Sequence, residues 1–149
     1  MAERLPQGLL DTSVVIDLEN IPPADLPVEV AICAITPAEL AAAPAATTEA
    51  AERARRQDRL QRTGAAFDPI PFDLEAARSY ARVYAAVVAQ GRKPRRRLAD
   101  LLIASVALTE GLPVITRNPD DSSGWRSSST SRPSATRTET GLRLCWSCS

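Results

Sequence analysis

The chain has 149 residues, of which 44% are hydrophobic, and its 18 basic and 18 acidic residues give a formal net charge of zero. These values predict one domain with a substantial core, and they exclude a protein that binds nucleic acid through an overall positive charge. Histidine is absent, which excludes a Ser-His-Asp triad and an HExxH zinc site. Three cysteines make no disulfide framework, and the longest aliphatic run, LLIASVAL from Leu101, is too short to span a bilayer. We therefore expect a reduced, cytoplasmic protein with no membrane segment.

The first half of the chain is predicted to alternate between strands and helices. An apolar run predicts a strand over 9–11 that turns into a short helix, and VEVAICAI predicts a strand from Val28 to Ile35 that is covered on both faces. The stretch TPAELAAA predicts a helix with Thr36 as its N-cap and Glu39 at its third position. Another helix is predicted from Thr47 to about Arg62, with a charged outer face.

The second half continues the alternation. The stretch FDPIPF predicts a short extended segment, after which Asp73 caps a helix that stops at Gly91. The basic loop RKPRRR precedes a helix from Leu98 to Glu110, and PVIT predicts another strand. Strands that alternate with helices predict an α/β protein with a parallel sheet.

The composition changes after Asp121. Residues 122–149 contain no Val or Ile, although they hold both tryptophans and two of the three cysteines. We interpret 1–121 as the folded domain and 122–149 as a low-complexity tail, disordered or aberrant in the way that a frameshift would produce. With no closing strand in the tail, the sheet edge near Val114 should be uncovered.

Four acidic residues occupy the same kind of position, at the end of a predicted strand or in the first turn of the helix that follows. They are Asp11, Glu39, Asp100 and Asp121. In an open parallel sheet these positions lie along one edge, where ligands bind. Carboxylates that converge there without Lys or His partners imply a cation, and oxygen ligands select Mg²⁺ or Mn²⁺ rather than zinc.

Each of these acids also has a purely structural interpretation. Glu39 completes a possible capping box with Thr36, Asp100 is a common kind of helix-start acid, and Asp121 fits a turn. Asp11 is the hardest to explain structurally, because a carboxylate that ends a buried strand must turn to solvent or be held by something positive. The structural interpretation requires four independent coincidences at one edge of the sheet, whereas one shared metal site explains all four acids. We therefore favour the metal site.

Three stretches, LLDTSVVID, ITPAELAAA and RRRLADLLIASVALTEGLPVITRNPDD, occur in this order. Together they resemble PIN-domain ribonucleases, in particular the VapC toxins of bacterial toxin–antitoxin pairs, over roughly residues 8–121. The resemblance implies a three-layer α/β/α domain with a central, mostly parallel sheet. Carried over by position, Asp11, Glu39 and Asp100 match the first three acidic residues of the family.

The fourth acid of the family usually lies in a Thr-x-Asn-x-x-Asp-Phe stretch. Thr116, Asn118 and Asp121 match this stretch, whereas Ser122 replaces the aromatic residue. Ser13 matches a family position where a hydroxyl or amide orders the first aspartate. The resemblance therefore assigns supporting roles to Ser13, Thr116 and Asn118.

The function that the resemblance implies is a metal-dependent endoribonuclease that cleaves structured RNA, often transfer or ribosomal RNA, and is silenced by a cognate antitoxin. One or two Mg²⁺ ions would bind the scissile phosphate and activate a water for in-line attack, so that no protein nucleophile is needed. Part of the helix after Asp73, together with the RARRQDRL helix, is expected to form a homodimer surface or an antitoxin groove, as in the family.

A cluster of basic residues lies just before the helix at Leu98: Arg92, Lys93, Arg95, Arg96 and Arg97. We favour contacts to RNA phosphates for this cluster over a merely solvated loop.

Two rival functions stay open. One is a catalytically impaired PIN-fold interaction module that binds antitoxin or RNA without cleavage, which the missing closing strand favours. The other is a phosphotransferase with a nucleophilic aspartate, which would need an Asp-x-Asp pair where this chain has Ser13.

Overall fold

A computed structural model describes residues 4–117 and 143–145 of the chain. Its described strands form one sheet in the order β2-β1-β3-β4. β1 pairs in parallel with both β2 and β3, whereas β3 and β4 are antiparallel. The predicted, mostly parallel sheet is therefore confirmed, and its strands are β1 (Gln7–Leu10), β2 (Glu29–Ala31), β3 (Val114–Thr116) and β4 (Arg143–Cys145).

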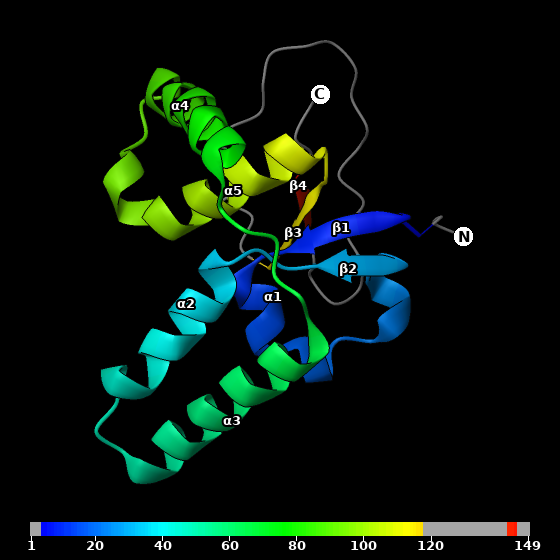
Figure 1. The fold of residues 1–149 in the computed structure, drawn as a ribbon, viewed down its shortest axis with the longest axis vertical. Helices are drawn as coiled ribbons and strands as arrows, with labels where there is room; N and C mark the ends of the chain where they lie inside the picture. The colour runs from blue at the N-terminus through cyan, green and yellow to red at the C-terminus, as the bar shows by residue number, and fades with distance from the viewer. Residues whose placement is uncertain (1–3, 118–142, 146–149) are drawn as a thin grey trace.

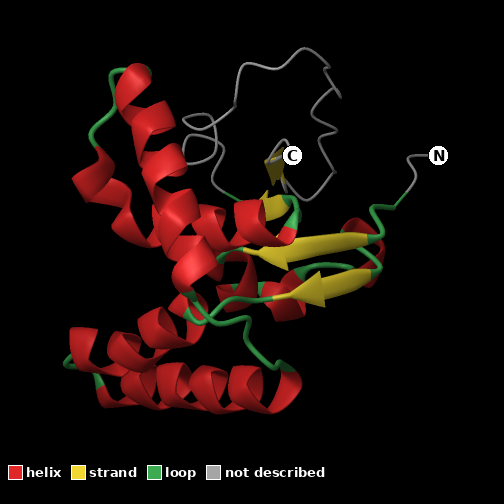
Figure 2. Ribbon diagram, turned by 45° about the horizontal axis from the view of Figure 1, so that its top comes forward, coloured by secondary structure: helices red, strands yellow, loops and turns green. Residues whose placement is uncertain are grey.

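Helices cover the sheet on both faces (Figures 1 and 2). On one face lie α4 (Leu74–Ala89) and α5 (Leu98–Glu110), which pack against each other. On the other lie α1 (Thr12–Ile16), α2 (Ile35–Ala42) and α3 (Ala50–Ala66). This arrangement confirms the three-layer α/β/α architecture. No helix in the described part of the chain combines the length and apolarity that crossing a membrane requires.

Two hydrophobic clusters join the layers, because successive residues of a strand point to opposite faces. Leu9 and Val114 pack into the cluster formed with α4 and α5, while Leu10 and Ile115 pack into the cluster formed with α1 and α2. Leu9 pairs with Val114 and Leu10 with Ile115 in the parallel ladder. The next backbone N–H, that of Asp11, donates to the Ile115 carbonyl at 2.9 Å, which fixes Asp11 at the carboxyl end of β1.

Several predicted boundaries agree with the structure. The Asp73 carboxylate caps α4 by accepting from the Ala76 N–H at 2.9 Å, and α5 spans the predicted residues and ends at Gly111, whose φ is 66°. Gly91 likewise follows the end of α4, with a φ of 72°. The extended segment around Ile70 forms a parallel bridge with Cys33 next to the end of β2.

Other boundaries were predicted wrongly. The second strand is shorter than the predicted range from Val28 to Ile35, because α2 already begins at Ile35. The N-cap of α2 is Ala34, which makes no side-chain capping bond. Thr36 is therefore not an N-cap, and there is no capping box with Glu39. The third helix is shifted toward the C-terminus of its predicted range and begins at Ala50.

The expectation of an uncovered sheet edge near Val114 is also wrong. β4 pairs with this edge, with Val114 opposite Cys145 and Thr116 opposite Arg143. A ladder of main-chain hydrogen bonds does not require β-branched side chains, so a composition without Val or Ile does not exclude such a strand. The rest of the predicted tail lies outside the described residues, and so do Asn118 and Asp121, which precede it. The domain boundary at residue 121 therefore stays a prediction.

Candidate functional site

Asp11 connects β1 to α1, and three hydrogen bonds hold its side chain. Its backbone is extended, with φ −70° and ψ 156°, and it is the N-cap of α1. One carboxylate oxygen, Oδ1, accepts from the Thr12 N–H at 2.7 Å. The other, Oδ2, accepts from the Ser13 hydroxyl at 2.9 Å and from the Thr116 hydroxyl at 2.8 Å. The carboxylate is therefore held in one orientation by three donors.

The electrostatic environment of Asp11 is unusual for a carboxylate that is only 6% exposed. All three donors are neutral, and no Lys or Arg of the described residues forms an ion pair with it. Buried charges in proteins are normally paired or coordinate a metal.

Burial raises the pKa of the Cys33 thiol, and the negative charge of Asp11 adds to this rise. Cys33 therefore stays protonated at neutral pH and is a poor metal ligand or nucleophile.

Glu39 lies on α2 and is connected to Asp11 through Thr12. The Thr12 hydroxyl donates to Glu39 Oε1 at 2.7 Å and lies 3.0 Å from the hydroxyl of Thr36. The side chain of Glu39 thus contacts α1 rather than capping its own helix. Figure 1 shows α1 and α2 both starting near the arrowhead of β1.

Sequence reasoning missed Thr12 and gave Thr36 the wrong role. Two signals could have found them. Thr12 directly follows the first acid, and Thr36 precedes Glu39 by one helical turn, which places both on the same helix face. Arg117, next to Thr116, adds a further connection, because its N–H donates to the Ser13 hydroxyl at 3.4 Å while its guanidinium pairs with Asp17.

Asp100 is half-buried in the first turn of α5, the helix that also contacts α2. Within residues 4–117 and 143–145, no three His, Cys, Asp or Glu side chains lie close enough together to hold a metal ion. The structure therefore links Asp11 with Glu39, and it does not gather Asp100 with both of them into one cluster. Asp121 and Asn118 lie outside the described part of the chain.

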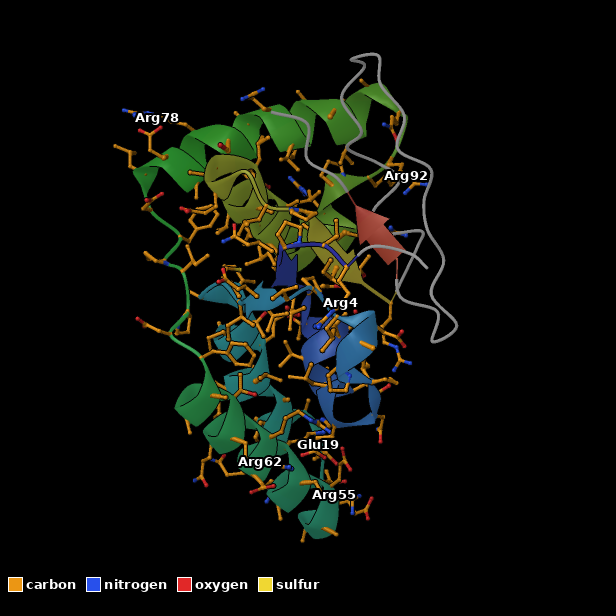
Figure 3. The ribbon with its side chains drawn as sticks, turned by 90° about the vertical axis from the view of Figure 1, so that its right-hand side faces the viewer. Arg4, Glu19, Arg55, Arg62, Arg78 and Arg92 are labelled. Carbon is orange, nitrogen blue, oxygen red and sulfur yellow. The ribbon has the colours of Figure 1, made fainter. Side chains whose placement is uncertain are left out.

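The predicted basic loop contains a short 3₁₀ helix, η4 (Pro94–Arg97), immediately before α5. Lys93 and Arg95 are exposed, whereas Arg92 and Arg97 are half-buried, and the side chain of Arg96 lies outside the described part. Figure 3 shows Arg92 at the opposite end of the molecule from Arg55 and Arg62 of α3.

Comparison with known proteins gives a consistent result. The family model described as PIN domain matches residues 9–122. Ribonuclease VapC5 of Mycobacterium tuberculosis is 39% identical over 116 residues, which cover 76% of this chain and 84% of that protein.

Two solved structures are also similar. The crystal structure of VapBC-5 from Mycobacterium tuberculosis, a member of the VapBC family of toxin-antitoxin systems, matches with a TM-score of 0.65 and 36% identity over 77% of this chain and 87% of that chain. The structure of VapBC2 from Rickettsia felis, bound to a DNA fragment from their promoter, matches with a TM-score of 0.59 and 21% identity over 75% and 87% of the two chains. At that identity the second likeness shows the fold alone.

Proposed function

This chain belongs to the PIN-domain family, and from that premise we propose that it is a divalent-metal-dependent endoribonuclease of the VapC type. The observation that carries the proposal is Asp11: a carboxylate 6% exposed, held by three neutral donors at the carboxyl end of a parallel strand. The 39% identity to a VapC ribonuclease supports the same activity.

The donor set of the site fits a divalent cation. Oδ2 of Asp11 already accepts two hydrogen bonds, so its lone pairs are used, whereas Oδ1 accepts one and keeps a lone pair for a cation. Carboxylate oxygens without histidine suit Mg²⁺ or Mn²⁺. The residues proposed to hold the ion are Asp11, Glu39, Asp100 and Asp121.

When bound, such a cation supplies positive charge that activates water and offsets the charge developing on the scissile phosphate. The protein's own residues prepare this site. Ser13 and Thr116 fix Asp11 before substrate arrives, which avoids reorganisation during the reaction. The hydrolysis needs no protein nucleophile, in keeping with a chain that has no histidine.

The partners that we propose are a cognate antitoxin, a second copy of the chain, and structured RNA such as transfer or ribosomal RNA. The solved relatives belong to VapBC toxin-antitoxin systems, which supports the antitoxin. On α4, the apolar side chains of Leu74, Tyr84 and Val88 are exposed, which suits a surface for either protein partner.

Neither rival function gains support. The inactive module was favoured by a missing closing strand, but β4 pairs with that sheet edge. A phosphotransferase needs a second acid at residue 13, where the Ser13 hydroxyl instead donates to Asp11.

The activity is tested by incubating the purified chain with transfer and ribosomal RNA in Mg²⁺. We expect a small number of defined cuts in structured RNA, and co-purification with the antitoxin should suppress them. Intact RNA after incubation with the antitoxin-free protein would refute the proposed activity.

The basic cluster before α5 is expected to contact RNA phosphates through its exposed members. Replacing Lys93 and Arg95 with Ala should weaken RNA binding. It should also reduce the magnitude of the negative slope of log K against log salt by about 1.4 to 1.8, because fewer counterions are released. The measurement is RNA affinity over a salt series, using the Asp11→Asn protein so that the RNA stays intact.

A matched control for this experiment removes the same charge at the other end of the molecule. Arg55→Ala with Arg62→Ala, on α3, should leave the salt slope unchanged (Figure 3). If the two double variants reduce the magnitude of the salt slope equally, the cluster before α5 is an ordinary solvated surface.

A further inference from the structure

Thr12 lies between two of the proposed metal-binding carboxylates and contacts both. It is the first residue of α1 and only 7% exposed. Its backbone N–H donates to Oδ1 of Asp11 at 2.7 Å, and its hydroxyl donates to Oε1 of Glu39 at the same distance. One residue therefore sets the position of two acids that come from different elements of the fold.

The direction of these hydrogen bonds follows from counting protons. A threonine hydroxyl has one proton and two lone pairs. The Thr12 proton goes to the Glu39 carboxylate, so the Thr36 hydroxyl, 3.0 Å away, must be the donor in the contact between the two threonines. The result is a chain of donation from Thr36 through Thr12 to Glu39. In such a chain each bond polarises the next and strengthens it.

The two threonines are buried, whereas the acid that they reach is exposed. Thr36 is 0% exposed, and Glu39, one turn further along α2, is exposed. An exposed glutamate normally samples several rotamers. The bond from Thr12 selects one of them, and within the described residues Oε2 accepts no hydrogen bond.

We propose that Thr12 is a positioning residue that orients Glu39 relative to Asp11 for cation binding, and that Thr36 sets the direction of the Thr12 hydroxyl. This inference rests on the proposed function, because it assigns the role within the same site. The competing explanation is that the Thr12 hydroxyl only fastens α1 to α2, and the experiment must separate the two.

The first measurement is Mn²⁺ affinity by calorimetry. Thr12→Val keeps the backbone N–H that holds Asp11 and the branched shape, but it removes the donor to Glu39. We expect Mn²⁺ affinity to fall by about 10- to 100-fold, as for other residues that orient a metal ligand. Thr12→Ser should restore the affinity, and Thr36→Val, which keeps the Thr12–Glu39 bond, should cause a smaller loss.

Thr109→Val is the matched control. The Thr109 hydroxyl pairs with the Ser79 hydroxyl at 2.9 Å and donates to the Ser105 carbonyl at 3.0 Å, within the α4–α5 pair. This variant also removes a hydroxyl that joins two helices, and we expect it to lower thermal stability while leaving Mn²⁺ affinity unchanged.

The decisive comparison is a double-mutant cycle with Glu39→Gln. If Thr12 acts through Glu39, the loss of Mn²⁺ affinity caused by Thr12→Val should largely disappear when Glu39 is already Gln. Losses that add in the double variant, or a Thr12→Val protein that binds Mn²⁺ like Thr109→Val, would overturn the positioning role while leaving the proposed function intact. A wild-type protein that neither binds Mn²⁺ nor cleaves RNA would overturn both.

Discussion

Asp11→Asn is expected to abolish metal-dependent RNA cleavage while the protein remains folded. The substitution removes the charge of a site acid that is only 6% exposed. A bound cation contributes several kcal/mol of transition-state stabilisation, and a loss of about 4 kcal/mol corresponds to a rate roughly 1,000-fold lower. We therefore expect cleavage to fall by at least about this factor.

The fold should tolerate asparagine because the hydrogen bonds around residue 11 can be rearranged. The amide oxygen can take the N–H of Thr12, and asparagine is as good an N-cap as aspartate. The amide nitrogen would then face the hydroxyls of Ser13 and Thr116, which can rotate to accept. Losing the charge removes a burial penalty but weakens three bonds, so the free energy of unfolding should change by less than about 2 kcal/mol.

Cleavage rates and urea unfolding of Asp11→Asn, measured on the same preparation, check this prediction. A variant that unfolds at much lower urea would make its inactivity uninformative about the site. A stable variant that cleaves RNA at the wild-type rate would show that Asp11 is a structural N-cap only.

Glu39→Gln is expected to remove most of the activity at almost no cost in stability. Glu39 is exposed, and within the described residues its one side-chain hydrogen bond is from the Thr12 hydroxyl. The amide oxygen of glutamine can accept this bond, while the negative charge that a cation requires is lost. We expect the free energy of unfolding to change by less than about 1 kcal/mol.

Two measurements check the Glu39 prediction: cleavage rate as a function of Mg²⁺ concentration, and thermal unfolding. If the loss reflects weaker ion binding, high Mg²⁺ should recover part of the rate. Wild-type cleavage at every Mg²⁺ concentration would remove Glu39 from the site. Glu75→Gln, an exposed acid paired with Arg78 on α4, is a suitable control and should leave the Mg²⁺ dependence unchanged.

Much of the fold could be predicted because it is encoded in local patterns. The bounds of α5 follow from its apolar run and from Gly111, whose positive φ ends the helix. The position of Asp11 at the carboxyl end of β1 follows from the break in the apolar pattern. These features depend on neighbours in sequence, so the sequence alone was sufficient.

The rest depends on contacts between residues that are distant in sequence. Thr36 looks like an N-cap locally, yet its hydroxyl contacts Thr12, 24 residues earlier, and α2 starts before it. The role of Thr12 as a bridge between Asp11 and Glu39 likewise exists only in the folded chain. β4 was missed because its pairing with β3 is made by main-chain groups, which composition does not reveal.

Removing and restoring the metal shows whether this site uses a divalent cation to cleave RNA. RNA is incubated with the purified chain after removal of metals by EDTA, and again after Mg²⁺ is restored, with Asp11→Asn prepared in parallel. We predict no cleavage without metal, defined cleavage when Mg²⁺ is restored, and none by the variant in either condition. Cleavage that persists in EDTA, or that is equal for wild type and Asp11→Asn, would show that a cation held by Asp11 does not drive the reaction.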